Sequence, residues 1–212
     1  MSNKKDLYPI TDENAFRWWQ ALQKGEEQAL HALYHMYRDD LFYYARRIVK
    51  GDELILNAIQ DLFLRLWNSR EKLGEARSVK AYLFSSLRRI LLSEQKKQFK
   101  YSVPLNDDEE NSSFADFSPE DIIILDEHTK LRSDLVAHLL NSLTSKQREI
   151  IYLKYYEELS IDEIATLLEI NYQSVINHLQ RSFLKLRKNT SPELLAASLL
   201  SISLLFVFIV NI

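Results

Sequence analysis

Glycine is so scarce in this chain that its scarcity alone limits the fold. Only three glycines occur among 212 residues, and Gly25, Gly51 and Gly74 all lie in the first third, whereas about 7% is usual in soluble proteins. A glycine-rich phosphate-binding loop or dinucleotide-binding fingerprint is therefore excluded, and the chain lacks the turn residues of a β fold. The prolines lie outside every long periodic segment, so we expect those segments to be helices.

The first hundred residues repeat apolar side chains at intervals of three and four, which is the pattern of helices with one buried face. Stripes of this kind begin at Phe16 and at Leu30. The segment after Gly51 is apolar over more than half of its circumference, so we expect it to be central. A fourth helix is predicted from about Ser78 to Lys97, with apolar residues inside and basic residues outside. These basic residues are Arg88, Arg89, Lys96 and Lys97.

Charge is distributed unevenly, although the formal net charge is only −3. Residues 1–100 hold 18 lysines and arginines against 13 acidic residues, while residues 101–138 hold 2 against 10. Residues 101–117 also lose apolar periodicity, and repulsion among their carboxylates favours an extended linker. We therefore predict two helical domains, at 1–100 and 126–190, joined by an acidic linker at 101–125. Their local basic faces are where a polyanion would bind.

Sharp helix boundaries return in the last third of the chain. Residues 144–147 and 160–163 are predicted capping boxes, and Asn171 can cap a third helix. We expect these helices to end near residues 155, 168 and 188. A short helix joined by about three residues to a longer basic helix is the arrangement of a helix-turn-helix motif.

The last of these helices carries an apolar stripe from Val175 to Leu186, which we expect to face the core. The opposite stripe is polar and basic. Amide side chains can pair with adenine and arginine with guanine, while lysines bind phosphates. A solvated face of an ordinary amphipathic helix is the competing interpretation. The candidate DNA-binding residues are Tyr172, Gln173, Ser174, Asn177, His178, Arg181, Lys185 and Lys188.

Two unlike motifs make the chain resemble the extracytoplasmic-function (ECF) sigma factors, which direct bacterial RNA polymerase to promoters. In the C-terminal part, the resemblance lies in Leu143 to Arg148, Ser160 to Ala165 and Ser174-Val175. In the N-terminal part, it lies in Ile59 to Trp67 (IQDLFLRLW) and Ala81 to Phe84 (AYLF). Both parts occur in the family's order, and the resemblance covers about two thirds of the chain.

This resemblance implies a sigma region 2-like helical bundle that binds core RNA polymerase and the −10 promoter element, and a sigma region 4-like domain that binds the −35 element. It also implies an anti-sigma factor as a partner, besides core RNA polymerase and promoter DNA. The residues expected at the core polymerase contact are Gln60, Asp61, Phe63 and Trp67. Those expected at the −10 element are Arg77, Lys80, Arg88, Arg89, Lys96 and Lys97.

One departure from the family pattern lies at the turn before the recognition helix. The family usually has a glycine there, and this chain has Glu169. We expect Glu169 either to adopt a costly positive φ or to accept a slightly different turn.

The C-terminal segment is strongly apolar. Residues 194–212 contain no charged side chain, and as a helix they would span about 28 Å, close to the thickness of a bilayer's hydrocarbon core. We therefore predict a hydrophobic helix at 191–212, which is a membrane anchor, a helix packed on this protein or a partner, or a disordered tail. We expect a cytoplasmic protein, which the first of these interpretations would tether to the inner membrane.

No catalytic or metal-binding constellation stands out. His31 and His35 have the spacing of two metal ligands on one helix, but no third ligand accompanies them, so we interpret them as ordinary helix histidines. The absence of cysteine excludes disulfides, thiolate metal sites and a cysteine nucleophile. We predict a protein that is not an enzyme and has no cofactor or metal.

The sequence thus predicts an all-α sigma factor that binds core RNA polymerase and directs promoter-specific initiation. One alternative is a stand-alone helix-turn-helix regulator, which would bind an operator without polymerase. Another is a membrane-tethered helical adaptor without a nucleic-acid role, in which replacing Arg181 and Lys185 would leave function intact.

Overall fold

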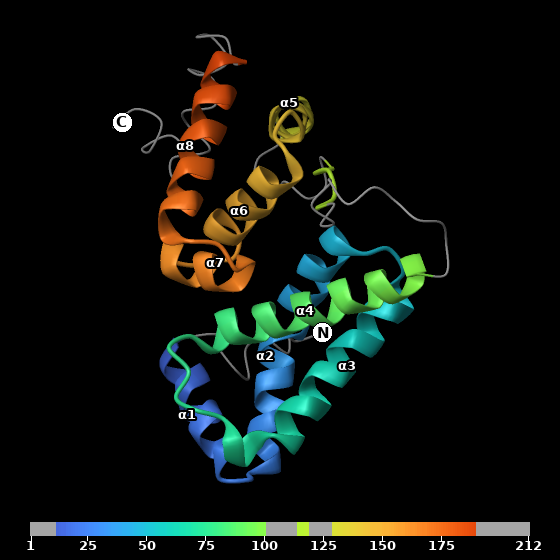
Figure 1. The fold of residues 1–212 in the computed structure, drawn as a ribbon, viewed down its shortest axis with the longest axis vertical. Coiled ribbons are helices and arrows are strands. Elements are labelled where there is room, and N and C mark those ends of the chain that lie inside the picture. Colours follow the sequence, from blue (N-terminus) through green and yellow to red (C-terminus); the bar gives the residue numbers. More distant parts are fainter. Residues whose placement is uncertain (1–11, 101–113, 119–128, 190–212) are drawn as a thin grey trace. The chain divides into compact units, whose positions relative to one another are not determined.

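The computed structural model describes residues 12–100, 114–118 and 129–189 (Figure 1). Eight α-helices and a short 3-10 helix form the regular structure of these residues, and no strand occurs among them. The predicted all-α fold is therefore confirmed. The helices form two compact units, one from α1 to α4 and one from α5 to α8.

The first unit is built around helix α2, which contacts the other three α-helices. Its elements are α1 (Asp12–Gln23), α2 (Glu27–Ile48), α3 (Asp52–Asn68), the 3-10 helix η2 (Arg70–Lys72) and α4 (Val79–Lys100). Helix α2 contacts α1, α3 and α4, and α3 packs on α4 as well. The core side chains are buried, as the apolar stripes predict; the largest that are fully buried are Tyr37, Tyr44, Phe84, Leu22, Leu33, Leu41, Ile55, Ile59, Leu83, Leu87 and Leu91.

Two glycines allow the chain to reverse direction between the first three helices. Gly25 has a φ of +86° and Gly51 has a φ of +104°, a region that residues with a side chain rarely adopt. The loop before α4 is tied back to α1, because the Trp19 indole donates to the Gly74 carbonyl at 3.1 Å and the Gln23 amide donates to the Leu73 carbonyl at 2.7 Å.

The second unit consists of α5 (Thr129–Asn141), α6 (Ser145–Tyr155), α7 (Ile161–Leu168) and α8 (Tyr172–Lys188). Each predicted cap is present. Thr144 and Gln147 form a reciprocal capping box at α6, the backbone N–H groups and side chains of Ser160 and Glu163 pair in the same way at α7, and the Asn171 side chain accepts from the backbone of Ser174 at α8. The predicted helix boundaries are therefore confirmed.

Residues 114–118 differ from the extended linker that the sequence predicts. Phe114 and Phe117 are only 1% and 3% exposed, and both rings pack against Tyr152 of α6, with centroids 5.5 and 6.5 Å apart. Aromatic side chains bury a large apolar surface, and here the stabilisation from this burial outweighs the repulsion among the acidic residues nearby. Residues 114–118 of the predicted linker therefore belong to the second unit.

Most of the predicted linker and the whole predicted helix at 191–212 lie outside the described residues. Among the helices that the structure does describe, none combines the length and the apolar character that a bilayer span requires.

Candidate nucleic-acid interface

Helix α8 has one buried face and one exposed polar face. Val175, Leu179 and Phe183 are at most 8% exposed, and Ser182 and Leu186 continue the same buried stripe. The Asn171 side chain fixes the start of the helix by accepting a 2.7 Å hydrogen bond from the backbone N–H of Ser174. The predicted core stripe is therefore confirmed, and the helix presents its other side to solvent.

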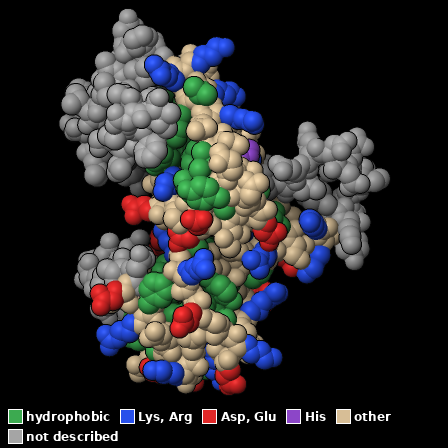
Figure 2. Space-filling model, turned by 60° about the vertical axis from the view of Figure 1, so that its left-hand side comes forward, with side chains coloured by type: hydrophobic (Ala, Val, Ile, Leu, Met, Phe, Trp, Pro, Cys, Tyr) green, Lys and Arg blue, Asp and Glu red, His purple; other side chains and the backbone are tan. Residues whose placement is uncertain are grey.

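The candidate DNA-binding residues on α8 all reach the surface. Ser174 and His178 are half-buried, and the others are exposed. No acidic side chain occurs in this helix. Figure 2 shows basic side chains gathered at the top of the molecule, where the C-terminal end of α8 lies. The exposed residues are Tyr172, Gln173, Asn177, Arg181, Lys185 and Lys188.

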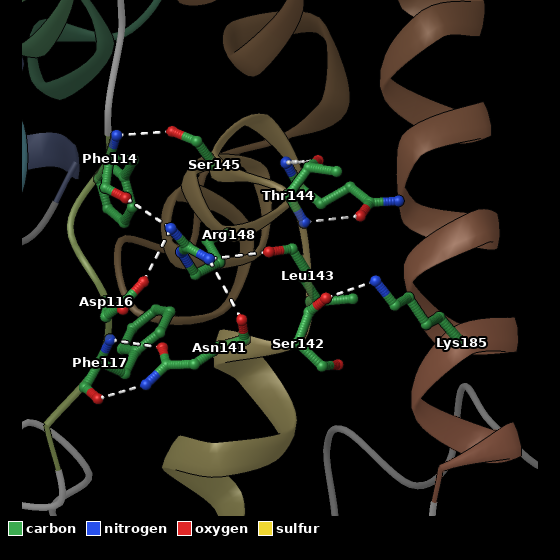
Figure 3. Close-up of polar contacts among 11 residues, drawn as sticks. Phe114, Asp116, Phe117, Asn141, Ser142, Leu143, Thr144, Ser145, Arg148 and Lys185 are labelled. Carbon is green, nitrogen blue, oxygen red and sulfur yellow. Dashed lines mark hydrogen bonds and ion pairs between the residues drawn. The ribbon is translucent and has the colours of Figure 1, made fainter.

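Three of these side chains, Gln173, Asn177 and Lys185, already have partners within the protein. The Gln173 amide donates to the Asn177 side-chain oxygen at 3.1 Å, one turn later on the helix. The Lys185 ammonium donates to the main-chain carbonyl of Ser142, at the end of α5 (Figure 3). An ammonium has three donors, so Lys185 can hold α8 against α5 and still bind a phosphate.

The position of α8 depends on its packing against α6. The Phe183 ring meets Tyr155 edge to face, with centroids 6.1 Å apart. Ser182, the residue before Phe183, is fully buried, and its hydroxyl donates to the His178 carbonyl within the helix at 2.7 Å. Burial raises the pKa of the Tyr155 phenol above its ordinary value, because a phenolate would lose its hydration there.

A hydrogen-bond network centred on Arg148 holds residues 114–118 against the start of α6 (Figure 3). The Arg148 guanidinium donates to the carbonyls of Phe114 at 3.0 Å and Leu143 at 2.7 Å, and it lies 2.9 Å from the Asp116 carboxylate. The Phe114 backbone N–H in turn donates to the Ser145 hydroxyl at 2.6 Å. One arginine thus joins the 114–118 segment, the end of α5 and the start of α6.

The Asn141 side chain completes this attachment. Its amide oxygen accepts from the Phe117 N–H at 2.7 Å, and its NH₂ group donates to the Phe117 carbonyl at 2.8 Å. Both backbone groups of one residue are therefore satisfied by one side chain. Arg148 lies in a motif that resembles the family, but its role here is not evident from the sequence, because nothing in the local pattern indicates a partner 34 residues away.

The basic face of the first unit lies along α4 and the loop before it. Arg77, Arg89, Lys96 and Lys97 are exposed, and Lys80 is half-buried with its ammonium 5.6 Å from the centroid of the Phe84 ring. The Arg89 guanidinium donates to the Ser85 hydroxyl at 3.0 Å, and Lys97 pairs with Glu94 at 2.7 Å.

Arg88 does not share this face, so the expectation that it points outward is wrong. Its side chain is buried, at 9% exposure. It lies four residues after Phe84 and three before Leu91, which places it on the same helix face as these two core residues. Arg89 is exposed although Arg88 is buried, because successive residues of a helix point about 100° apart.

A groove runs between α3 and α4 on the same side as Arg89. Three cations line it, namely Arg65, Arg89 and Lys97, together with the hydroxyls of Ser69, Ser86 and Ser93 and the exposed ring of Tyr82. Glu94 is the one acidic side chain in the lining. Cations, hydroxyls and an aromatic ring are the side chains that bind a nucleic-acid backbone and an unstacked base.

The outer face of α3 contains the predicted polymerase contact. Gln60 is exposed, and Asp61 forms a 2.6 Å ion pair with Arg65 one turn later. The hydrogen bond from this pair raises the pKa of Arg65 above its ordinary value, so this cation stays charged. Trp67 is half-buried beneath the Arg70 guanidinium, which lies 4.3 Å from the ring centroid.

Phe63 is not available at this face, contrary to expectation. It is 5% exposed, and its ring packs edge to face on Tyr34 of α2 with centroids 5.2 Å apart. The apolar residue that does reach solvent is Leu64, at 61% exposure, four residues after Gln60. Leu64 does not stand out in the sequence, because α3 is apolar on most of its circumference. Its spacing from Gln60 was the available signal. Leu184 of α8, at 67% exposure, is a second exposed leucine that the sequence did not single out.

Comparisons with known proteins point to one family. The family model described as Sigma-70 region 2 matches residues 33–100, and that described as Sigma-70, region 4 matches residues 133–186. The chain is 27% identical over 165 residues to the ECF RNA polymerase sigma factor SigL of Mycobacterium tuberculosis, which covers 77% of this chain and 89% of SigL. It is 25% identical over 167 residues to the ECF RNA polymerase sigma factor SigX of Bacillus subtilis, over 77% of this chain and 84% of SigX.

Among solved structures, CnrH in complex with the cytosolic domain of CnrY matches with a TM-score of 0.52 and 20% identity, over 82% of this chain and 96% of CnrH. This likeness concerns the fold alone.

Proposed function

The chain belongs to the ECF sigma factors, which bind core RNA polymerase and direct transcription initiation at specific promoters, and we propose that its two helical units divide the recognition of the promoter between them. The first unit, within 1–100, would bind core polymerase and the −10 element, and the second, within 126–190, would bind the −35 element. Sigma factors are in general regulators without catalytic activity of their own.

The exposed face of α8 is the observation that carries the assignment of the −35 element. Its amides and Arg181 lie in the N-terminal two thirds of the helix, and its cations continue to Lys188 with no acidic residue between them. Helix-turn-helix proteins read base edges from the N-terminal part of such a helix. We propose that Gln173, Asn177 and Arg181 contact bases, while Lys185 and Lys188 contact phosphates.

The groove between α3 and α4 supports the assignment of the −10 element. The exposed cations Arg89 and Lys97 would bind the DNA backbone, and the exposed ring of Tyr82 would stack on an unpaired base. Arg77, Lys80 and Lys96 would extend the basic surface along the same helix and its preceding loop. Arg88 is left out of this proposal because it is buried.

The outer face of α3 supports the assignment of the polymerase contact. Gln60, Asp61 and Trp67 reach solvent there beside Leu64. An exposed apolar side chain surrounded by polar groups is typical of the centre of a protein interface. We propose Leu64 in place of Phe63 as the apolar member of this contact.

An anti-sigma factor is a further proposed partner, which the membership of the ECF family implies. We also propose that the protein acts in the cytoplasm, where core polymerase and promoter DNA are found. A tether through residues 194–212 remains a prediction, because these residues lie outside the described part of the chain.

The proposed function is tested by combining the purified protein with core RNA polymerase on a promoter fragment that contains both elements. We expect co-elution with core polymerase and run-off transcripts that neither component makes alone. Operator binding without polymerase, together with no run-off transcript, would instead favour a stand-alone regulator. Leu64→Ser should weaken co-elution, whereas Leu184→Ser, an equally exposed leucine on α8, serves as the matched control.

A further inference from the structure

Two histidines meet on the exposed side of α2. His31 and His35 lie one helical turn apart, and their Nε2 atoms are 3.0 Å from each other. The ring centroids are 4.2 Å apart. His31 is exposed and His35 is half-buried, so the two nitrogens are accessible from solvent.

The separation of the two nitrogens suits a metal chelate. With metal–nitrogen bonds of about 2.0–2.1 Å, an ion bound to both atoms would see them at an angle of about 94°. This angle matches neighbouring positions of a square-planar or octahedral ion and falls short of the tetrahedral angle of about 109°. We propose that His31 and His35 form a bidentate site for Cu²⁺ or Ni²⁺, the ions that prefer nitrogen ligands in such geometries.

Water would fill the remaining coordination positions. No group of three or more histidine, cysteine, aspartate or glutamate side chains could hold an ion together within the described part of the chain. Asp39, one turn after His35, is occupied by an ion pair with Arg38 at 3.1 Å. Glu27, one turn before His31, is exposed. These two carboxylates favour a cation nearby without serving as ligands.

Metal binding would replace the contact that the two rings make now. In the metal-free protein one Nε2 donates a proton to the other, whereas a metal needs the lone pairs of both Nε2 atoms. The ring that carries its N–H on Nε2 can shift to the tautomer with the proton on Nδ1, so both rings stay neutral. The contact is therefore exchanged for the metal without a net change of protonation in a neutral pair.

The experiment is equilibrium dialysis of the full-length, tag-free protein against NiCl₂, followed by the electron paramagnetic resonance spectrum of the Cu²⁺-loaded protein. We expect one ion per chain and a Cu²⁺ spectrum with nitrogen ligands. His31→Ala and His35→Ala should each lower the Ni²⁺ affinity at least tenfold. His138→Ala, which removes an exposed histidine of α5, is the matched control and should leave the affinity unchanged.

Unchanged Ni²⁺ affinity in both His31→Ala and His35→Ala would overturn the proposal, and so would an equal loss in His138→Ala. Circular dichroism of each variant shows whether its helices are retained. His31→Gln provides a second variant, because glutamine keeps a polar side chain of similar length, which alanine does not. It should lose the same affinity. The assay needs no polymerase or DNA, so its outcome is independent of the proposed function.

Discussion

The guanidinium of Arg148 in α6 donates a 3.0 Å hydrogen bond to the main-chain carbonyl of Phe114, 34 residues earlier in the chain. The same side chain is only 12% exposed and also binds the Leu143 carbonyl and the Asp116 carboxylate. One arginine therefore joins Phe114 and Asp116 of the predicted linker to Leu143, just before the start of α6.

Replacing this arginine should destabilise the second unit. Arg148→Ala leaves buried carbonyls of Phe114 and Leu143 without their donor, and we expect the free energy of unfolding to fall by about 2–3 kcal/mol. Urea unfolding of the full-length protein measures the loss, and hydrogen exchange at residues 114–118 should increase with it. Asp116→Asn is the control, because the Asp116 side chain is 71% exposed and an exposed ion pair contributes little. Equal effects of the two changes would contradict this role for Arg148.

Residues at two positions of α8 should affect DNA binding in different ways. Arg181→Ala should weaken binding to the preferred −35 sequence by about 1–3 kcal/mol and relax discrimination at one base pair, if Arg181 contacts a base. Lys188→Ala should weaken binding to all sequences alike and lower the salt dependence by about one counterion. Fluorescence anisotropy with matched and mutated −35 duplexes at several salt concentrations distinguishes the two. Equal loss on both duplexes in Arg181→Ala would assign it to the phosphates.

A glutamate at the end of α6 carries backbone strain that glycine would relieve. Glu158 has a φ of +57° and an exposed side chain, and the N–H of Leu159 closes the helix end by donating to the Leu153 carbonyl at 3.0 Å. Glu158→Gly should raise the free energy of unfolding by about 1 kcal/mol, because glycine adopts this φ without a steric penalty. Glu158→Val should lower it. Thermal unfolding of both variants tests the sign, and an unchanged melting temperature in both would refute the strain.

The second unit should lose stability in alkaline solution through Tyr155. Burial raises the pKa of this phenol in the folded protein, so the folded state holds its proton more tightly than the unfolded chain does. The stability that it contributes is complete below the unfolded pKa of about 10 and is lost as the pH rises through the folded value. Tyr155→Phe should move the midpoint of alkaline unfolding to higher pH in circular dichroism measurements. Tyr43→Phe, at a site that is 62% exposed, should leave that midpoint in place.

Local rules in the sequence were sufficient for the helices of the second unit and for the buried stripe of α8. Capping side chains such as Thr144 and Asn171 act within three residues of their partners, so their effect can be read from adjacent positions. Glu169 illustrates the limit of this reasoning. Its positive φ of +55° was one of two outcomes that the sequence left open.

The errors concern side chains whose environment is set by distant residues. Arg88 shares a helix face with Phe84, and Phe63 packs against Tyr34 of another helix. The charge of Arg88 and the hydrophobicity of Phe63 therefore do not show by themselves which of the two side chains is buried. Phe114 and Phe117 are isolated aromatic residues in an acidic segment without periodicity, and only the tertiary structure provides Tyr152 as their partner. Leu64 and Leu184 show the opposite case: each is apolar, but it is exposed because no helix of its own unit covers it.

The central claim is that this protein selects the start sites of core RNA polymerase through α8. Sequencing the 5′ ends of transcripts made on genomic DNA by core polymerase, with and without the protein, tests it most directly. We predict new start sites that share a pair of upstream motifs and that are lost when Arg181→Ala replaces the intact protein. Start sites identical to those of core polymerase alone, or new sites that Arg181→Ala leaves unchanged, would contradict the account.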